Sequence, residues 1–261
     1  MRVMSWNLHG LRGSDGRRDP ERVARVIAEL RPDVAGLQEV GLPGAPDPAE
    51  LLAGLTGMRG AFGPTMSHWL GFAYGNAVLS RHRIVGVRNY DLSVRRREPR
   101  GCVRVDVELA DTRVHFFCAH LGLHWRERRK QAAQLLSADV LRDAALAHPL
   151  VLVGDFNSFS NRSAVPRWLR RQLVDAAIAA RNEAPTFPSS FPLLRLDHCY
   201  VGPAIRVAGV DVIRTAETRL ASDHLPVLVE LEVRPGARRP PAPRLVEAPG
   251  VTTRRDGRPP G

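Results

Sequence analysis

The sequence has little lysine, few cysteines and no long apolar run, and each shortage excludes a class of protein. Of the 38 basic residues in the 261-residue chain, only Lys130 is a lysine. The three cysteines, Cys102, Cys118 and Cys199, are odd in number and widely spaced. That pattern excludes a disulfide scaffold and predicts reduced core residues. No apolar run approaches the roughly 20 residues that span a bilayer, which excludes an integral membrane protein.

The first ten residues show no signal-peptide pattern, so we expect a cytoplasmic protein. The formal net charge of +11 indicates a polyanionic partner, either nucleic acid or an anionic membrane surface. An arginine-biased genome explains the same charge equally well, and no obligate protein partner is evident. Residues 234–261 hold seven arginines, seven prolines and two acidic residues. We expect a disordered tail there, either a phosphate-binding arm or an inert extension.

The apolar pattern predicts one α/β domain over residues 1–233, built from two sheets packed face to face and covered by helices. Asp19 and Asp47, each followed by proline, are expected to cap two helices. Further helices are expected over 125–147 and 163–173. Strands are expected over 3–8, 34–38, several segments between 61 and 120, 150–153, 197–201, 205–213 and 226–233.

Polar residues stand where six of these strands end or begin, and a sheet presents catalytic groups at such positions. Short carboxylate and amide side chains suit Mg²⁺, histidines exchange protons near neutral pH, and no spacing resembles a zinc site. Taken singly, each residue could be a turn former or a structural histidine. Together they predict one site formed by Asn7, Glu39, His120, Asp155, Asn157, Asp197, Asp223 and His224.

The ordered motifs resemble those of the endonuclease/exonuclease/phosphatase superfamily, which includes deoxyribonuclease I, exonuclease III-type abasic endonucleases, neutral sphingomyelinases and inositol polyphosphate 5-phosphatases. The resemblance covers about residues 1–233. It implies a four-layered α/β sandwich, two packed mixed β-sheets flanked by helices, with the active site at one edge. The motifs are Trp-Asn-Leu, Leu-Gln-Glu, Asn-Ala-Val-Leu-Ser-Arg, His-Leu, Gly-Asp-Phe-Asn, Arg-Leu-Asp-His and Ser-Asp-His-Leu-Pro-Val.

The same resemblance implies a role for each site residue. Glu39 would be the principal Mg²⁺ ligand, with Asn7 beside it and Asp223 near or on the metal, and Mn²⁺ could substitute. Asp155 would orient or deprotonate the attacking water. The remaining implied roles are donation to the phosphoryl oxygens by Asn157 and polarisation of His224 by Asp197. Whether His224 or Asp155 takes the proton of the water stays open.

Residues on the leaving-group side follow from the resemblance as well. His120 would protonate the leaving oxygen or stabilise its charge. Arg100 is a candidate phosphate contact, or else an exposed edge-strand charge. Asn76 and Glu98 are expected beside His120. Where many members read Arg-Ile-Asp-Tyr-Ile, this chain has a histidine at His198, which puts local packing rather than the metal chemistry in question.

The favoured function is Mg²⁺-dependent hydrolysis of phosphodiesters by in-line attack of water. Nucleic acid is the favoured substrate, because arginine clusters suit phosphate binding. The alternative is a sphingomyelinase-like phosphodiesterase or phosphatase for phospholipid headgroups or small metabolites. Trp69 and Leu70 could then touch a membrane, although a buried role is favoured for both. A non-catalytic phosphate-binding module is disfavoured, because every expected catalytic position is filled.

Overall fold

The computed structural model of the protein describes every residue except 46, 68–71, 111, 235, 237 and 239–261. Two six-stranded sheets form its centre, in the orders β11-β12-β1-β2-β4-β3 and β5-β6-β7-β8-β10-β9. The β1–β2 and β7–β8 pairs are parallel and the other pairs antiparallel, so both sheets are mixed. The first sheet comprises β1 (Arg2–Asn7), β2 (Val34–Val40), β3 (Arg59–Ser67), β4 (Ala73–Ser80), β11 (Ile205–Val212) and β12 (Val227–Val233). The second comprises β5 (Arg83–Asp91), β6 (Gly101–Glu108), β7 (Arg113–His120), β8 (Leu150–Asp155), β9 (Val174–Asp175) and β10 (Asp197–Val201).

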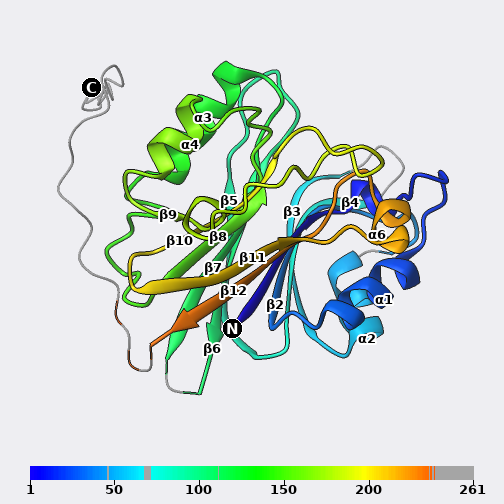
Figure 1. The fold of residues 1–261 in the computed structure, drawn as a ribbon, viewed down its shortest axis with the longest axis horizontal. Helices are drawn as coiled ribbons and strands as arrows, with labels where there is room; N and C mark the ends of the chain where they lie inside the picture. The colour runs from blue at the N-terminus through cyan, green and yellow to red at the C-terminus, as the bar shows by residue number, and fades with distance from the viewer. Residues whose placement is uncertain (46, 68–71, 111, 235, 237, 239–261) are drawn as a thin grey trace, which may run out of the picture.

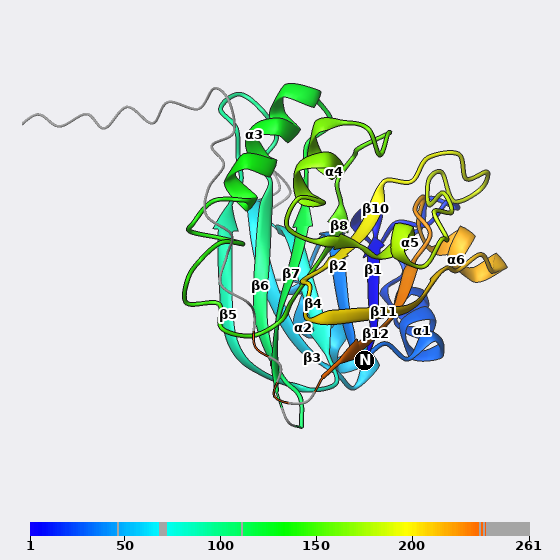
Figure 2. The ribbon, with the colours of Figure 1, turned by 60° about the vertical axis from the view of Figure 1, so that its left-hand side comes forward.

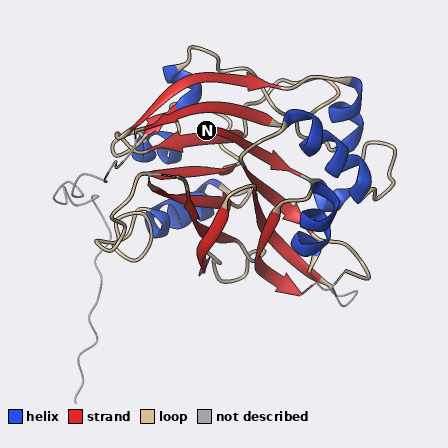
Figure 3. Ribbon diagram, turned by 90° about the horizontal axis from the view of Figure 1, so that it is seen from below, coloured by secondary structure: helices blue, strands red, loops and turns tan. Residues whose placement is uncertain are grey.

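Helices lie on the outer side of each sheet, which completes the four layers and confirms the predicted sandwich (Figures 1 and 2). The strands lie between the two groups of helices when the molecule is seen from below (Figure 3). The group beside the first sheet is α1 (Pro20–Leu30), α2 (Pro48–Thr56) and α6 (Ala216–Ala221). The second sheet is covered by α3 (Trp125–Leu135) and α4 (Ala164–Leu169), while α5 (Ala176–Ala179) contacts β10 and β11.

The helix starts follow from capping chemistry. The Asp19 side chain accepts a hydrogen bond from the backbone N–H of Arg22. The Asp47 side chain accepts from Ala49 and Glu50 in the same way. Each carboxylate therefore satisfies backbone donors that the first turn leaves without partners, as the Asp-Pro pairs predict.

Three apolar layers hold the sandwich together, because successive side chains of a strand point to opposite faces. Valines and small residues such as Val3, Val34 and Val151 pack between the two sheets. Larger side chains on the opposite faces, such as Trp6, pack under α1 and α2. Phe117 belongs to the third layer, under α3 and α4. The predicted cysteines are free and buried.

One expected helix is shorter than predicted. The apolar spacing predicts a helix from 125 to 147, but α3 ends at Leu135 and turns follow it. The Ser137 hydroxyl accepts from the N–H of Asp139, which favours a turn over a further helical turn. Val140 and Leu146 are still buried in the layer under α3, so the spacing of these apolar residues reflects their packing and not a helical conformation. The helix predicted over 163–173 is likewise limited to α4.

Several expectations fall outside this description. Trp69, Leu70 and most of the predicted tail lie outside the described residues. The buried role expected for Trp69 and Leu70, their alternative membrane contact and the expected disorder of 234–261 stay predictions. None of the helices that the structure describes combines the length and apolar character needed to cross a bilayer.

Candidate active site

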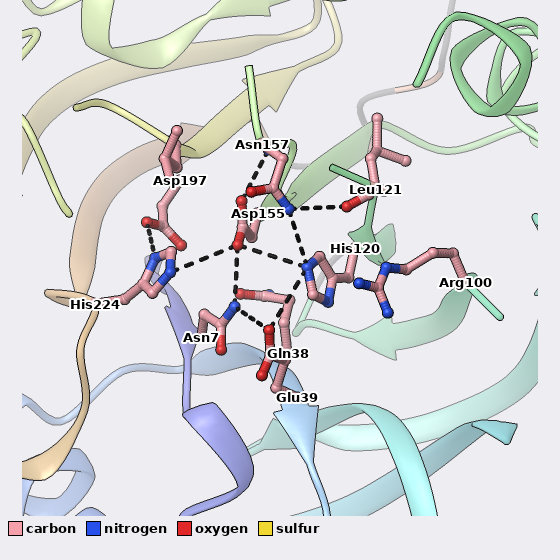
Figure 4. Close-up of polar contacts among 12 residues, drawn as sticks. Asn7, Gln38, Glu39, Arg100, His120, Leu121, Asp155, Asn157, Asp197 and His224 are labelled. Carbon is pink, nitrogen blue, oxygen red and sulfur yellow. Dashed lines mark hydrogen bonds and ion pairs between the residues drawn. The ribbon is translucent and has the colours of Figure 1, made fainter. Parts of the chain in front are cut away.

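Strand alternation brings four predicted site residues to one edge of the sandwich. Val3, Ser5 and Asn7 share the face of β1 that packs between the sheets, so Asn7 is the polar end of a core row. The same periodicity places His120 at the end of β7, Asp155 at the end of β8 and Asp197 at the start of β10. The register pairs Asp155 with both His120 and Asp197. The inter-sheet core thus ends in a cluster of titratable side chains (Figure 4).

Unusual backbone at this edge directs three further groups. Glu39 has φ 53° and lies where the β2–β4 register shifts, so its carboxylate joins Asn7 at the site. Asn157 has φ 47°. A Cβ on Gly154 would lie 1.8 Å from the carbonyl oxygen of Ala119. Only glycine therefore allows β8 to approach β7 closely enough to set Asp155 beside His120.

Asp155 is the centre of the hydrogen-bond network. One carboxylate oxygen accepts from the backbone N–H of Asn157 at 2.9 Å, and the other accepts from the Asn7 amide at 3.0 Å. The Nε2 atoms of His120 and His224 lie 3.6 and 3.7 Å from that second oxygen. Burial, followed by the negative charge of Asp197, raises the pKa of Asp155 to about 7. A carboxylate with such a pKa can exchange protons near neutral pH.

His224 is paired with Asp197, as the sequence predicts for this histidine. Its Nδ1 lies 2.8 Å from Asp197 Oδ2. Burial disfavours the charged imidazole, but the charge of Asp197 and this hydrogen bond outweigh burial and raise the pKa of His224 to about 10. At neutral pH His224 therefore holds its proton, and its Nε2–H faces Asp155.

His120 has the opposite electrostatic character. Burial and then the positive charge of Arg100 lower the pKa of His120 to about 3, so the imidazole is neutral at neutral pH. The Asn157 amide donates one hydrogen to the Leu121 carbonyl and directs its nitrogen at His120 Nε2, 3.3 Å away. His120 Nε2 then accepts, and the ring proton is on Nδ1. The predicted leaving-group role stays a prediction.

Arg100 is buried beside the site and held by the neighbouring acidic residue. Its Nη1 and Nη2 lie 2.8 and 3.0 Å from the two carboxylate oxygens of Glu98. The exposed-charge interpretation of Arg100 is therefore wrong, since only 8% of its side chain is exposed. The Asn76 amide donates to the carbonyl of Gly101 at 2.9 Å, and so ties β4 to the start of β6 next to Arg100.

The residues predicted to hold a metal form a second, more open group. Glu39 accepts hydrogen bonds from the Tyr74 hydroxyl at 2.7 Å and the Asn7 amide at 3.1 Å. Burial opposes its ionisation, but the neighbouring His120 and these hydrogen bonds lower the pKa of Glu39 to about 2. Because His120 is neutral at neutral pH, the hydrogen bonds from Tyr74 and Asn7 are the interactions that keep Glu39 ionised at that pH. Asp223 lies opposite, and both carboxylates reach His9 Nδ1, at 3.9 Å from Glu39 Oε2 and 3.4 Å from Asp223 Oδ2.

These donors fit a divalent cation. Glu39 and Asp223 present hard carboxylate oxygens that are partly open to solvent, which suits an ion that keeps some of its waters. Asp155, Asp197 and His224 also bring potential ligand atoms within 4.8 Å of one another. That trio is buried, and its shortest contact is the His224–Asp197 hydrogen bond, which a metal would have to break. The Glu39–Asp223 position is therefore the better metal site.

Comparison with known proteins agrees with this geometry. The model of the Endonuclease/Exonuclease/phosphatase family matches residues 4–224. The chain belongs to this family. The uncharacterized protein YbhP of Escherichia coli K12 is 34% identical over 180 residues, covering 63% of this chain and 70% of YbhP.

Solved structures of the family share the fold. A Beutenbergia cavernae member is 25% identical with a TM-score of 0.74, over 89% of this chain and 71% of that one. The mannosyl-6-phosphatase of Bacteroides thetaiotaomicron is 23% identical with a TM-score of 0.73, over 89% of this chain and 99% of that one. Family membership makes this chain a hydrolase of the phosphoric ester type, while the fold leaves the substrate undecided.

Two residues of the site were missed by the sequence analysis. Tyr74 occupies a strand position with no motif of its own, and its burial beside Glu39 raises its pKa, so it stays a donor. His9 follows Asn7 by two residues and has φ 48°, a conformation that sequence patterns do not reveal. A histidine this close to Asn7 was the only signal available.

Proposed function

We propose that the protein is a Mg²⁺-dependent phosphodiester hydrolase that acts on nucleic acid, with Mn²⁺ as a substitute metal. The observation that carries the reaction is the opposite protonation of two neighbours, Asp155 and His224. Their environments separate the two pKa values, to about 7 for Asp155 and about 10 for His224. Such separation is the usual basis for assigning one group as base and the other as a cationic stabiliser.

Asp155 is the group that accepts the proton of the attacking water. Its second oxygen lies among Asn7, His120 and His224, where a water next to the phosphorus can donate to it. His224 cannot accept a proton while Asp197 holds it in the charged form. It donates instead through Nε2–H toward the negative charge that builds on the phosphoryl oxygens.

The remaining residues orient the phosphoryl group. A divalent ion bound by Glu39 and Asp223, with Asn7 adjacent, would polarise a phosphoryl oxygen and neutralise charge. Asn157 donates to the phosphoryl oxygens by exchanging its 3.3 Å contact with His120. Arg100, held by Glu98, contributes a fixed positive charge on the His120 side.

A rim of arginines and aromatic rings next to the site supports a nucleic-acid substrate. Trp125 follows His120 by five residues, and the guanidinium carbons of Arg126 and Arg129 lie 5.0 and 5.9 Å from its ring centroid. Phe159 follows Asn157 by two residues, with Arg128 at 5.4 Å. The half-exposed rings can accept unstacked bases, while the exposed Arg126 and Arg129 can bind phosphates. The rim therefore favours single-stranded or unpaired nucleic acid.

Exposed apolar side chains on the neighbouring loops favour a second candidate, a phospholipid phosphodiesterase. Leu123, Phe191 and Leu193 are 67%, 71% and 66% exposed. They lie after β7 and before β10, on segments that lead into the site. The aliphatic tips of Leu123 and Leu193 do not stack on bases, whereas a membrane interface would bury all three side chains.

The test is turnover on a single-stranded DNA oligonucleotide, its duplex, RNA, phosphatidylglycerol vesicles and bis(p-nitrophenyl) phosphate, with Mg²⁺ and with EDTA. We expect fastest Mg²⁺-dependent cleavage of the single strand, and a rise in KM of about tenfold for Trp125→Ala on that substrate alone. Leu193→Ser serves as the matched control. Preferred vesicle hydrolysis that Leu193→Ser abolishes would establish the second candidate. Absence of Mg²⁺-dependent hydrolysis on every substrate would overturn the proposal.

A further inference from the structure

His9 lies where the proposed cation would bind. Its Nδ1 is 3.4 Å from Asp223 Oδ2 and 3.9 Å from Glu39 Oε2, so the imidazole faces both proposed ligands at once. Its side chain is 48% exposed, which leaves the other edge of the ring open to solvent. Neighbouring ligand atoms of an octahedral ion lie about 3 Å apart. The two separations from His9 exceed that by less than an ångström, within the rotation available to a half-exposed side chain.

The backbone around His9 is held in an uncommon conformation that points the ring at the carboxylates. His9 has φ 48° and Leu11 has φ 60°, both in the left-handed region. The N–H of His9 donates to Asn7 Oδ1 at 3.0 Å, and the carbonyl of Gly10 accepts from Arg18 at 2.6 Å. The buried Leu11 anchors the turn from below. A strained conformation that several contacts maintain at a charged site indicates a functional constraint.

We propose that His9 binds the metal through Nδ1, as a nitrogen ligand beside Glu39 and Asp223. This inference rests on the proposed metal-dependent function. An imidazole in an otherwise oxygen site favours Mn²⁺ and Co²⁺ over Mg²⁺, because Mg²⁺ prefers oxygen ligands whereas divalent transition-metal ions also bind an imidazole nitrogen. His9 is thus the residue that sets the metal preference. The sequence analysis predicts oxygen ligands alone, whereas this site also includes one nitrogen ligand.

Mn²⁺ binding to the full chain tests this without relying on turnover. Electron spin echo envelope modulation detects a nitrogen bonded directly to Mn²⁺, and continuous-wave spectra of free Mn²⁺ give the affinity. We expect nitrogen modulation in the wild type and its loss in His9→Asn. Asparagine tolerates the left-handed backbone and supplies an oxygen, so the turn is retained. Mn²⁺ affinity should fall about tenfold in that variant, and Mg²⁺ affinity, measured by competition, less than about threefold.

His82→Ala is the matched control, since His82 also faces a carboxylate, Asp33, at 3.8 Å and is 37% exposed, but lies outside the site. It should leave the modulation and both affinities unchanged. If the nitrogen modulation survives in His9→Asn and disappears in His120→Ala, the nitrogen ligand is His120 and the inference is overturned. Mn²⁺ bound without any nitrogen modulation would also overturn it. If Glu39→Gln binds Mn²⁺ as tightly as the wild type does, the metal site of the proposed function is overturned instead.

Discussion

Neutralising Asp197 should remove a large pH dependence of stability. The folded-state pKa of His224 is raised to about 10, whereas an unfolded histidine titrates near 6.5. Between these values the folded protein binds one more proton than the unfolded chain. The contribution of His224 to the free energy of unfolding is therefore fully present below about pH 6.5 and is lost as the pH rises toward about 10. One proton corresponds to about 1.4 kcal/mol per pH unit, or about 2.7 kcal/mol from about pH 7.5 to about pH 9.5.

Asp197→Asn removes the two largest interactions that raise the pKa of His224, the charge of Asp197 and its hydrogen bond. Burial then opposes only the weaker charges of Asp155 and Asp223, and we expect the pKa of His224 to fall below that window. Urea unfolding in EDTA at about pH 7.5, 8.5 and 9.5 measures the difference between the two proteins. Unfolded cysteines titrate near 8.5 and contribute equally to both, so they cancel. Asp33→Asn, at a partly buried carboxylate beside His82 and outside the site, is the control. Stability curves for wild type and Asp197→Asn that run parallel within about 1 kcal/mol would refute the reasoning.

Three further outcomes are expected. Removal of residues 236–261 leaves the thermal midpoint nearly unchanged, since that sequence has few apolar side chains; if it is a phosphate-binding arm, the salt dependence of polyanion binding flattens. Because a neutral His120 imidazole can still donate its one ring N–H to charge on the leaving oxygen, His120→Ala loses more rate on a natural diester than on bis(p-nitrophenyl) phosphate, while His224→Ala loses rate on both; equal losses for His120→Ala would refute its leaving-group role. Gly154→Ala destabilises by about 3 kcal/mol or more in denaturant melts, because its Cβ meets backbone, whereas Gly209→Ala, with nothing within 4 Å, does not.

The positions of Asn7, His120, Asp155 and Asp197 could be anticipated because strand periodicity is a local property of sequence. Each follows or precedes an apolar row, and the row predicts both the strand and the face on which the polar residue emerges. β7 and β8 pair in parallel, which brings His120 and Asp155 at their ends together. The sequence suggests this pairing only through the family resemblance of its motifs.

The remainder depends on long-range packing. Glu39 and His9 reach the site through left-handed backbone that tertiary contacts maintain. The buried, neutral state of His120 follows from Arg100 and from burial, neither of which a strand-end histidine reveals. The segment after Leu135 has helical spacing but forms turns. Its apolar residues are buried in the layer under α3 without being helical, so the spacing alone does not distinguish a helix from turns.

The rate of Glu39→Gln at saturating Mg²⁺, on the best substrate found, shows whether hydrolysis depends on a metal held by Glu39. Glutamine keeps the shape of the side chain and removes the charge that holds the cation, so the fold, followed by circular dichroism, stays intact. We expect kcat to fall by at least about two orders of magnitude. Glu29→Gln, an exposed glutamate on α1, should match the wild type. A loss of less than about tenfold in Glu39→Gln, or full wild-type activity in EDTA, would contradict a metal-dependent reaction at this site.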